Sequence, residues 1–186
     1  MPESPRSRRR PKAGFTLVEV LLALAVLVVA VGGTLGTLNA YVRLDQQTAQ
    51  KSMALRVAEE RIERLRAEPF SMLFERYNAE TADDPTGFFS SPGNGFAVPG
   101  LDMQDGDADG LAGEIFFPVD PSAPGVLRED ITDSRLGTPK DLNRDGVIDS
   151  LDHRLDHVLL PVRVEVRWTG PAGMQSVTLD SLLSPR

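Results

Sequence analysis

Residues 15–38 read FTLVEVLLALAVLVVAVGGTLGTL and form the longest apolar run of the chain. As a helix rising 1.5 Å per residue, these 24 residues span about 36 Å, enough to cross a bilayer core of about 30 Å. Glu19 is the only charged residue of the run. The segment therefore predicts a membrane-spanning helix. Its small residues, Gly32, Gly33 and Gly36, would let neighbouring helices approach closely.

Charge is distributed unevenly on the two sides of this segment. Residues 1–14 contain four Arg and one Lys against one Glu, a net charge of +4, and because the total is −7 the rest of the chain carries −11. Basic residues beside a membrane helix stay in the cytoplasm. This predicts a single-pass protein of the cytoplasmic (inner) membrane, with its N-terminus in the cytoplasm and its C-terminal domain outside. The acidic domain argues against nucleic acid as a partner.

Glu19 needs an explanation, because a carboxylate in mid-membrane costs roughly 2.5–3.5 kcal/mol. It lies only six residues after Ala13, near the interface, which lowers this cost, so a Glu that snorkels to the interface is the alternative to a functional role. The residues around it, Lys12-Ala13-Gly14-Phe15-Thr16-Leu17-Val18-Glu19, resemble the type IV prepilin signature. The resemblance implies that a prepilin peptidase cuts between Gly14 and Phe15 and methylates the new N-terminus at Phe15. It also implies that Glu19 docks onto the N-terminal amine of a neighbouring subunit, which would compensate two costly charges in lipid.

The partners implied by this resemblance are the prepilin peptidase, other pilin or pseudopilin subunits, and the assembly platform of the inner membrane. An ordinary secretory signal cleaved near Leu38-Asn39-Ala40 is the alternative. Its apolar region would exceed the usual 7–15 residues, and it would leave Glu19 unexplained.

Helical character continues through residues 39–68, since Tyr41 to Glu68 contain no Gly or Pro. An apolar stripe recurs at spacings of three and four, formed by Leu55, Ala58, Ile62 and Leu65, and Glu60 and Arg64 form an i,i+4 pair. Pro69 ends the pattern. We predict one helix of about 54 residues, or about 80 Å, apolar in its first half and amphipathic in its second. Residues 54–67 resemble minor pilins and the pseudopilin group called I.

Residues 69–157 form an acidic insertion rich in turn residues, with 8 Pro and 10 Gly in 89 positions. This density makes long regular elements improbable, although the run Gly113–Val119 favours short strands.

Within the insertion, Asp141-Leu-Asn143-Arg-Asp145-Gly146-Val147-Ile148-Asp149-Ser-Leu-Asp152 follows the spacing of a twelve-residue calcium loop. The spacing predicts a Ca²⁺ site whose oxygen ligands come from the side chains of Asp141, Asn143, Asp145, Asp149 and Asp152 and from the carbonyl of Val147. Gly146 would permit the turn, and Ile148 would point inward. Asp152 stands where such loops usually have a bidentate Glu. The alternative is a solvated acidic turn.

Two further features of the insertion are weaker. Asp105, Asp107 and Asp109 repeat the opening of the calcium-loop spacing, but positions nine and twelve are Gly113 and Phe116, so a second Ca²⁺ site remains an open alternative. His153 and His157 are four apart, with no Glu of an H-E-x-x-H motif between them. We expect them to be partly exposed rather than transition-metal ligands.

Residues 158–186 predict a C-terminal β-hairpin. Val162, Val164, Val166 and Trp168 alternate with charged residues, residues 169–173 form a turn, and a second alternating strand follows. The apolar faces of the strands would pack on Leu55, Ile62 and Leu65. The chain has no cysteine, so disulfides and thiolate metal sites are excluded.

Taken together, these features predict an α+β, pilin-like fold: a basic leader, a long N-terminal helix, a loop-rich insertion and a small antiparallel sheet. The function expected is that of a structural subunit, a minor one, of a type IV pilus or type II secretion pseudopilus. Catalytic motifs such as G-x-S-x-G are missing, so no enzyme activity is expected. The alternatives are a membrane-anchored calcium-binding or adhesive module that does not polymerise, and an anchored hydrolase that uses an acidic pair.

Overall fold

A computed structural model describes residues 14–87, 90–102 and 110–185. The chain divides into two compact units, Met1–Leu44 and Asp45–Arg186. The second acidic cluster, Asp105, Asp107 and Asp109, lies outside the described residues, as does the basic leader apart from Gly14.

The helix α1 runs from Leu17 to Ala67 without interruption, over 51 residues. It includes the whole predicted amphipathic segment, residues 39–68, except Glu68. The helix ends just before Pro69, because proline lacks the N–H that a further turn needs. Within the first unit its apolar side chains are exposed; those of Leu17 and Val29 are 76% and 75% exposed. This half of the helix meets the length and composition needed to cross a membrane.

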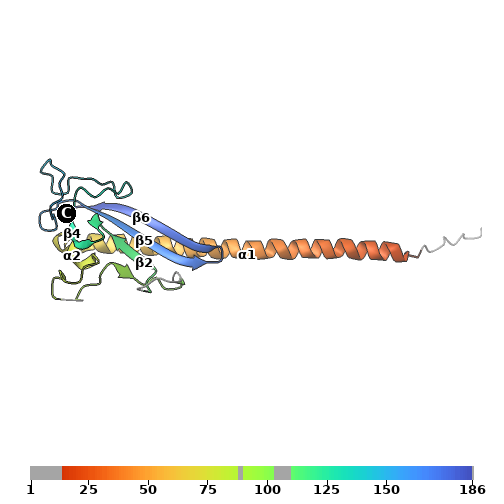
Figure 1. Ribbon diagram of the computed structural model, residues 1–186. Coiled ribbons are helices and arrows are strands. Elements are labelled where there is room, and N and C mark those ends of the chain that lie inside the picture. Colours follow the sequence, from red (N-terminus) through yellow and green to blue (C-terminus); the bar gives the residue numbers. More distant parts are fainter. Residues whose placement is uncertain (1–13, 88–89, 103–109, 186) are drawn as a thin grey trace, which may run out of the picture. The chain divides into compact units, whose positions relative to one another are not determined.

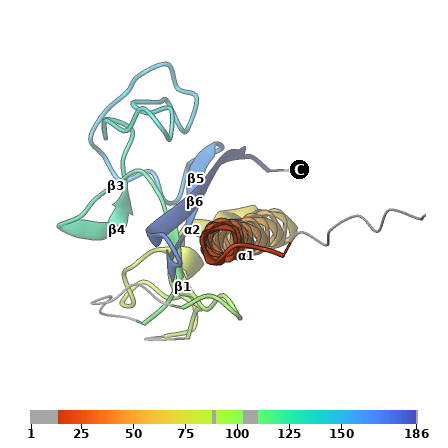
Figure 2. The ribbon, with the colours of Figure 1, turned by 90° about the vertical axis from the view of Figure 1, so that its right-hand side faces the viewer.

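The second unit is built on a four-stranded antiparallel sheet in the order β1-β2-β5-β6 (Figure 1). Its strands are β1 (Gly95–Phe96), β2 (Gly113–Phe116), β5 (Leu160–Gly170) and β6 (Gly173–Leu183), and a separate pair is formed by β3 (Val119–Asp120) and β4 (Ala123–Leu127). A short 3-10 turn, η1 (Phe70–Met72), and a helix, α2 (Leu73–Tyr77), follow α1. In Figure 2 the sheet lies between the second half of α1 and the β3–β4 pair.

The core lies between α1 and the sheet. Alternation along β5 turns Val162, Val164, Val166 and Trp168 inward, where all four are fully buried. At about 1.5–3 kcal/mol for each large apolar side chain buried, this face supplies much of the driving force for packing. The helix contributes the stripe Ala54, Ala58, Ile62 and Leu65.

The predicted helix stripe was wrong at one position. Leu55 is 40% exposed, and Ala54 takes its place with no exposed surface. Ala54, Ala58, Ile62 and Leu65 keep the spacing of three and four, so the pattern was right but its first member was displaced by one residue. The small side chains of Ala54 and Ala58 are fully buried, which allows the helix to approach the strands closely.

The hairpin turn is tighter than predicted, because β5 extends to Gly170 and β6 begins at Gly173. Only Pro171 and Ala172 lie between the paired strands, and Gly173 has a φ of +97°, which favours glycine. On the sheet face away from α1, Arg163 pairs with Asp180 at 2.7 Å and with Asp133 at 3.2 Å. The fold class predicted from the sequence, a long helix on a small antiparallel sheet, is confirmed.

Candidate functional site

The first candidate site is the segment at the start of α1. Gly14, Phe15 and Thr16 precede the helix and are exposed. Thr16 caps it, since its Oγ1 accepts a hydrogen bond from the backbone N–H of Glu19 at 3.3 Å and its carbonyl accepts one from the N–H of Val20 at 3.2 Å. The peptide bond between Gly14 and Phe15 therefore lies in accessible, non-helical chain, the form that a peptidase requires.

Glu19 lies in the first turn of α1, one turn from Phe15, among exposed apolar side chains. It lines a shallow hollow on this unit together with Phe15, Val20 and Leu24. Among the described residues, no cationic side chain forms an ion pair with it. If the chain were cleaved before Phe15, the new ammonium group would lie at the positive end of the helix dipole. Its positive charge would be destabilised there, and a nearby carboxylate would compensate it.

The second candidate site is the loop formed by residues 141–152. Its turns are held by its own side chains. The carboxylate of Asp141 accepts hydrogen bonds from the N–H groups of Arg144 at 2.5 Å and Gly146 at 2.9 Å, and Asp145 accepts one from Val147 at 2.8 Å. Gly146 has a φ of +88°, so the turn needs glycine there. Ile148 is 49% exposed, so the prediction that it points inward is wrong.

A buried acid approaches this loop from another part of the chain. Glu129 has no exposed surface, and its carboxylate accepts hydrogen bonds from the N–H groups of Leu142 at 2.5 Å, Asn143 at 3.2 Å and Asp149 at 3.4 Å. Together with Asp149 and His153 it forms a group whose ligand atoms all lie within 4.8 Å of one another, the right spacing to hold a metal ion. Sequence reasoning missed Glu129, because it lies twelve residues before the loop and follows no ligand spacing.

His153 links the carboxylates around the loop. Its Nε2 lies 3.0 Å from Asp149 and 3.7 Å from Glu129, and its Nδ1 lies 3.1 Å from Asp156. Burial alone would lower the pKa of His153, but the hydrogen bonds to Asp149 and Asp156 and the charge of Glu129 raise it above its ordinary value. Protonation of His153 would add positive charge to an otherwise acidic cluster, which is why the neighbouring carboxylates favour it.

The two histidines are more deeply buried than expected. His153 is 4% exposed and His157 is 7% exposed, so the prediction that they are partly exposed is wrong. The Nδ1 of His157 lies 3.0 Å from the carbonyl of His153, and its ring lies against Phe70 with a centroid distance of 4.9 Å. Burial lowers the pKa of His157, which favours a neutral ring inside the core.

Asp152 and Asp156 differ in their relation to the loop. The carboxylate of Asp152 accepts a hydrogen bond from the N–H of Leu127 at 3.3 Å and pairs with Arg154 at 3.0 Å. By contrast, Asp156 lies 3.2 Å from the side-chain nitrogen of Asn143. The donors at the loop are mainly carboxylate and amide oxygens, the ligands that calcium prefers, and the nitrogen of His153 is the exception.

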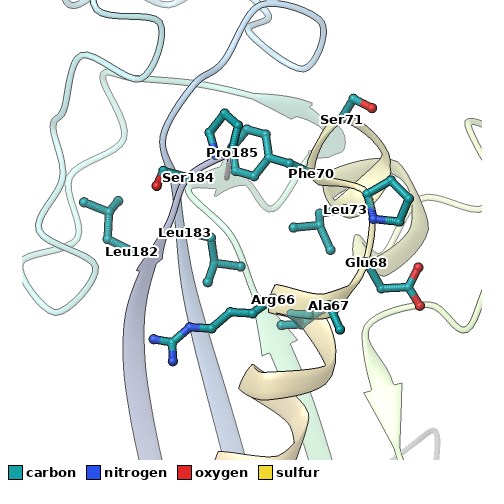
Figure 3. A pocket seen from close by; sticks show the side chains of 12 residues that line it. Arg66, Ala67, Glu68, Phe70, Ser71, Leu73, Leu182, Leu183, Ser184 and Pro185 are labelled. Carbon is teal, nitrogen blue, oxygen red and sulfur yellow. The ribbon is translucent and has the colours of Figure 1, made fainter.

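A hollow of about 910 Å³ lies where α1 ends beside the end of β6 (Figure 3). Its lining is mixed: the apolar side chains include Leu65, Phe70, Leu73 and Leu183, and Ser71 and Ser184 are among the polar ones. The charged groups on its rim are already paired, Arg66 with Glu63 and Glu68 with Arg76.

The chain was compared with known proteins. Residues 9–35 match the family model described as the prokaryotic N-terminal methylation motif. No curated protein and no solved structure matches the chain. The matched segment contains the Gly14–Phe15 bond, Glu19 and most of the apolar half of α1. The prepilin signature predicted from the sequence is therefore confirmed, and the chain carries the N-terminal motif of type IV pilin-like and pseudopilin-like proteins.

Proposed function

We propose that this protein is a structural subunit, a minor one, of a type IV pilus or a type II secretion pseudopilus. Prepilin peptidase cleaves it between Gly14 and Phe15 and methylates Phe15, and α1 then packs against the helices of other subunits. The methylation motif at residues 9–35 is the observation that carries the proposal. The exposed Gly14–Phe15 bond and the uncovered apolar half of α1 support it.

Assembly in this proposal depends on Glu19. While the subunit is alone in the membrane, the carboxylate lies in an apolar surface and is costly there. A neighbouring subunit's N-terminal ammonium compensates it, and the loss of either charge leaves the other uncompensated. The pairing also sets how far one helix is displaced along the next, because only one axial offset brings the amine to the carboxylate.

The experiment that tests this function is the determination of the N-terminal residue and mass of the protein from its native membrane. A chain that starts at N-methylated Phe15 is the expected result. An intact Met1, or a start near Tyr41, would exclude the pilin proposal and favour an anchored or secreted calcium-binding module.

A calcium ion in the loop of residues 141–152 is the second part of the proposal. The oxygen ligands come from Asp141, Asn143, Asp145, Asp149 and the carbonyl of Val147, as the spacing predicts. We propose that Asp156 closes the site in place of Asp152, because Asp156 lies beside Asn143 while Asp152 is hydrogen-bonded to Leu127. In a chain without cysteine, such an ion would fix an insertion that has little regular structure.

A further inference from the structure

Three possible metal ligands lie beside the loop of residues 141–152, and they come from two separate parts of the chain. Glu129 follows the end of β4, whereas Asp149 lies in the loop and His153 follows it directly. The Nε2 of His153 lies 3.0 Å from Asp149 Oδ1 and 3.7 Å from Glu129 Oε2. The backbone N–H of His153 donates a hydrogen bond to the carbonyl of Leu127 at 2.9 Å. The end of β4 therefore holds His153 in place next to Glu129.

The carboxylates of this group carry more negative charge than the side chains around them compensate. Glu129 has no exposed surface, and a buried carboxylate is stable only when it is paired or bound to a cation. In the described part of the chain, no Lys or Arg forms an ion pair with Glu129, Asp149 or Asp156, and all three share the imidazole of His153. One imidazole cannot compensate three carboxylates, so the group favours a further cation.

The two carboxylate oxygens of Glu129 differ in how well they are satisfied. Oε1 accepts hydrogen bonds from the N–H groups of Leu142 at 2.5 Å and Asn143 at 3.2 Å. The hydrogen bond to Oε2 is longer, since the N–H of Asp149 lies 3.4 Å away, and His153 Nε2 at 3.7 Å is beyond hydrogen-bond distance. Oε2 is therefore a buried oxygen with capacity left to bind a cation, and it faces the imidazole.

We propose that Glu129 Oε2, Asp149 Oδ1 and His153 Nε2 bind a small divalent transition-metal ion such as zinc. Zinc bonds of about 2.0–2.2 Å at tetrahedral angles place two ligand atoms about 3.3–3.6 Å apart. The separations of 3.0 Å and 3.7 Å from Nε2 lie on either side of this range. The side chain of Asp149 is 34% exposed, which leaves a path for the ion and for a water molecule in the fourth position.

The ligand types favour zinc over calcium at this point. Calcium prefers six to eight oxygen ligands, whereas imidazole nitrogen together with carboxylate oxygen suits zinc. The second nitrogen of His153, Nδ1, lies 3.1 Å from Asp156 Oδ1. A carboxylate in this position keeps the proton on Nδ1 and leaves the lone pair of Nε2 for the metal. The bound ion takes the place of a proton on Nε2, which is released to solvent.

This zinc site is distinct from the proposed calcium site, although the two are adjacent. Asp156 directs Oδ2 towards Asn143 of the calcium loop and Oδ1 towards His153. Glu129 and His153 belong to the zinc site alone. The inference goes beyond the proposed subunit function and does not depend on it. Its consequence is a metal cross-link between the end of β4 and the loop.

Titration of the full-length protein in detergent with ZnCl₂, followed by isothermal calorimetry in excess CaCl₂, tests the proposal. The expected result is one zinc ion bound per chain while calcium saturates its own loop. Glu129→Gln and His153→Gln should each lower the zinc affinity by at least about tenfold. Glu129→Gln keeps an oxygen for the N–H groups of Leu142 and Asn143, so this variant preserves the fold. Absence of zinc binding in the presence of calcium would overturn the proposal.

Asp141→Asn provides the matched control, because Asp141 is a calcium ligand that accepts hydrogen bonds from Arg144 and Gly146 rather than from the zinc ligands. It should change the zinc affinity by less than about threefold. An equal loss in Asp141→Asn and Glu129→Gln would place the zinc in the calcium loop and contradict the proposal. Cobalt bound in place of zinc gives a second measurement, since its visible absorption should disappear in His153→Gln. The N-terminal mass of the same protein reports the proposed pilin processing separately.

Discussion

The indole Nε1–H of Trp168 donates a hydrogen bond to the side-chain oxygen of Gln50 at 3.2 Å, joining β5 to α1 across 118 residues. Trp168 is fully buried. A buried N–H that loses its acceptor costs about 1–3 kcal/mol. We therefore expect Gln50→Leu to lower the free energy of unfolding by about that amount. Urea titration followed by Trp168 fluorescence measures this, since the chain has one tryptophan.

The exposed Gln46→Leu serves as the control for that substitution and should change stability by less than about 0.5 kcal/mol. If both variants unfold at the same urea concentration, the hydrogen bond does not contribute.

The stripe observed on α1 predicts losses of stability of different size for two Leu→Ala substitutions. Leu65→Ala removes a fully buried side chain and should cost about 2–5 kcal/mol. Leu55→Ala removes a side chain that is 40% exposed and should cost less than about 1 kcal/mol. Thermal unfolding of both variants by circular dichroism decides between the observed stripe and the one predicted from the sequence, which would make the two costs similar.

Glu19→Ala should be cleaved and methylated normally but should fail to assemble. Without the carboxylate, a neighbouring subunit's ammonium is left uncompensated in lipid, at a free-energy cost of roughly 2.5 kcal/mol. This cost lowers the assembled fraction by more than about tenfold. Glu19→Asp keeps the charge and should retain part of the assembly. Sheared filament fractions report assembly, and the N-terminal mass reports processing. Normal assembly by Glu19→Ala would contradict the proposed role of the carboxylate.

Calcium should raise the stability of the protein by about 2.7 kcal/mol when its concentration is a hundred times the dissociation constant. Asp141→Asn should remove this gain. Between the two candidate closing acids, Asp156→Asn should weaken binding more than Asp152→Asn, because only Asp156 lies beside Asn143. Isothermal titration with CaCl₂ provides the measurement, and the reverse order would restore Asp152 as the closing ligand.

The ion pair between Asp133 and Arg163 predicts a loss of stability in acid. Burial raises the pKa of Asp133, but hydrogen bonds from the N–H groups of Arg135 and Leu136 and the charge of Arg163 outweigh it, so the pKa is lowered. Stability from this group is therefore present above the unfolded pKa of about 3.9 and is lost as pH falls through the lower folded value. Asp133→Asn should flatten this part of the pH profile of unfolding. An unchanged profile would contradict the assignment.

The sequence was most informative where spacing alone carries meaning. The apolar run and Glu19 predicted the first half of α1, and the alternation of Val162 to Trp168 predicted β5. It was least informative where distant segments meet. No local pattern marks Glu129, which becomes important only because the fold brings it to Leu142 and Asp149. The placement of His153 likewise depends on a separate segment, because its backbone N–H donates a hydrogen bond to the carbonyl of Leu127 at 2.9 Å. Leu55 is an intermediate case. The sequence shows the spacing of apolar residues along α1, but which of them face inward depends on how the sheet packs against the helix.

The bonds between α1 and the hairpin also constrain the order in which the protein folds. Arg66 and Ser181 are separated by 115 residues, yet their side chains lie 3.1 Å apart. Contacts this distant in sequence form late, because a long loop must close first. The helix can therefore form early, but its apolar stripe (Ala54, Ala58, Ile62 and Leu65) stays exposed to solvent until residues 160–183 pack against it. If the chain crosses a membrane as proposed, the domain completes its core only after export, and any chaperone that guards it must cover Ile62 and Leu65 until then.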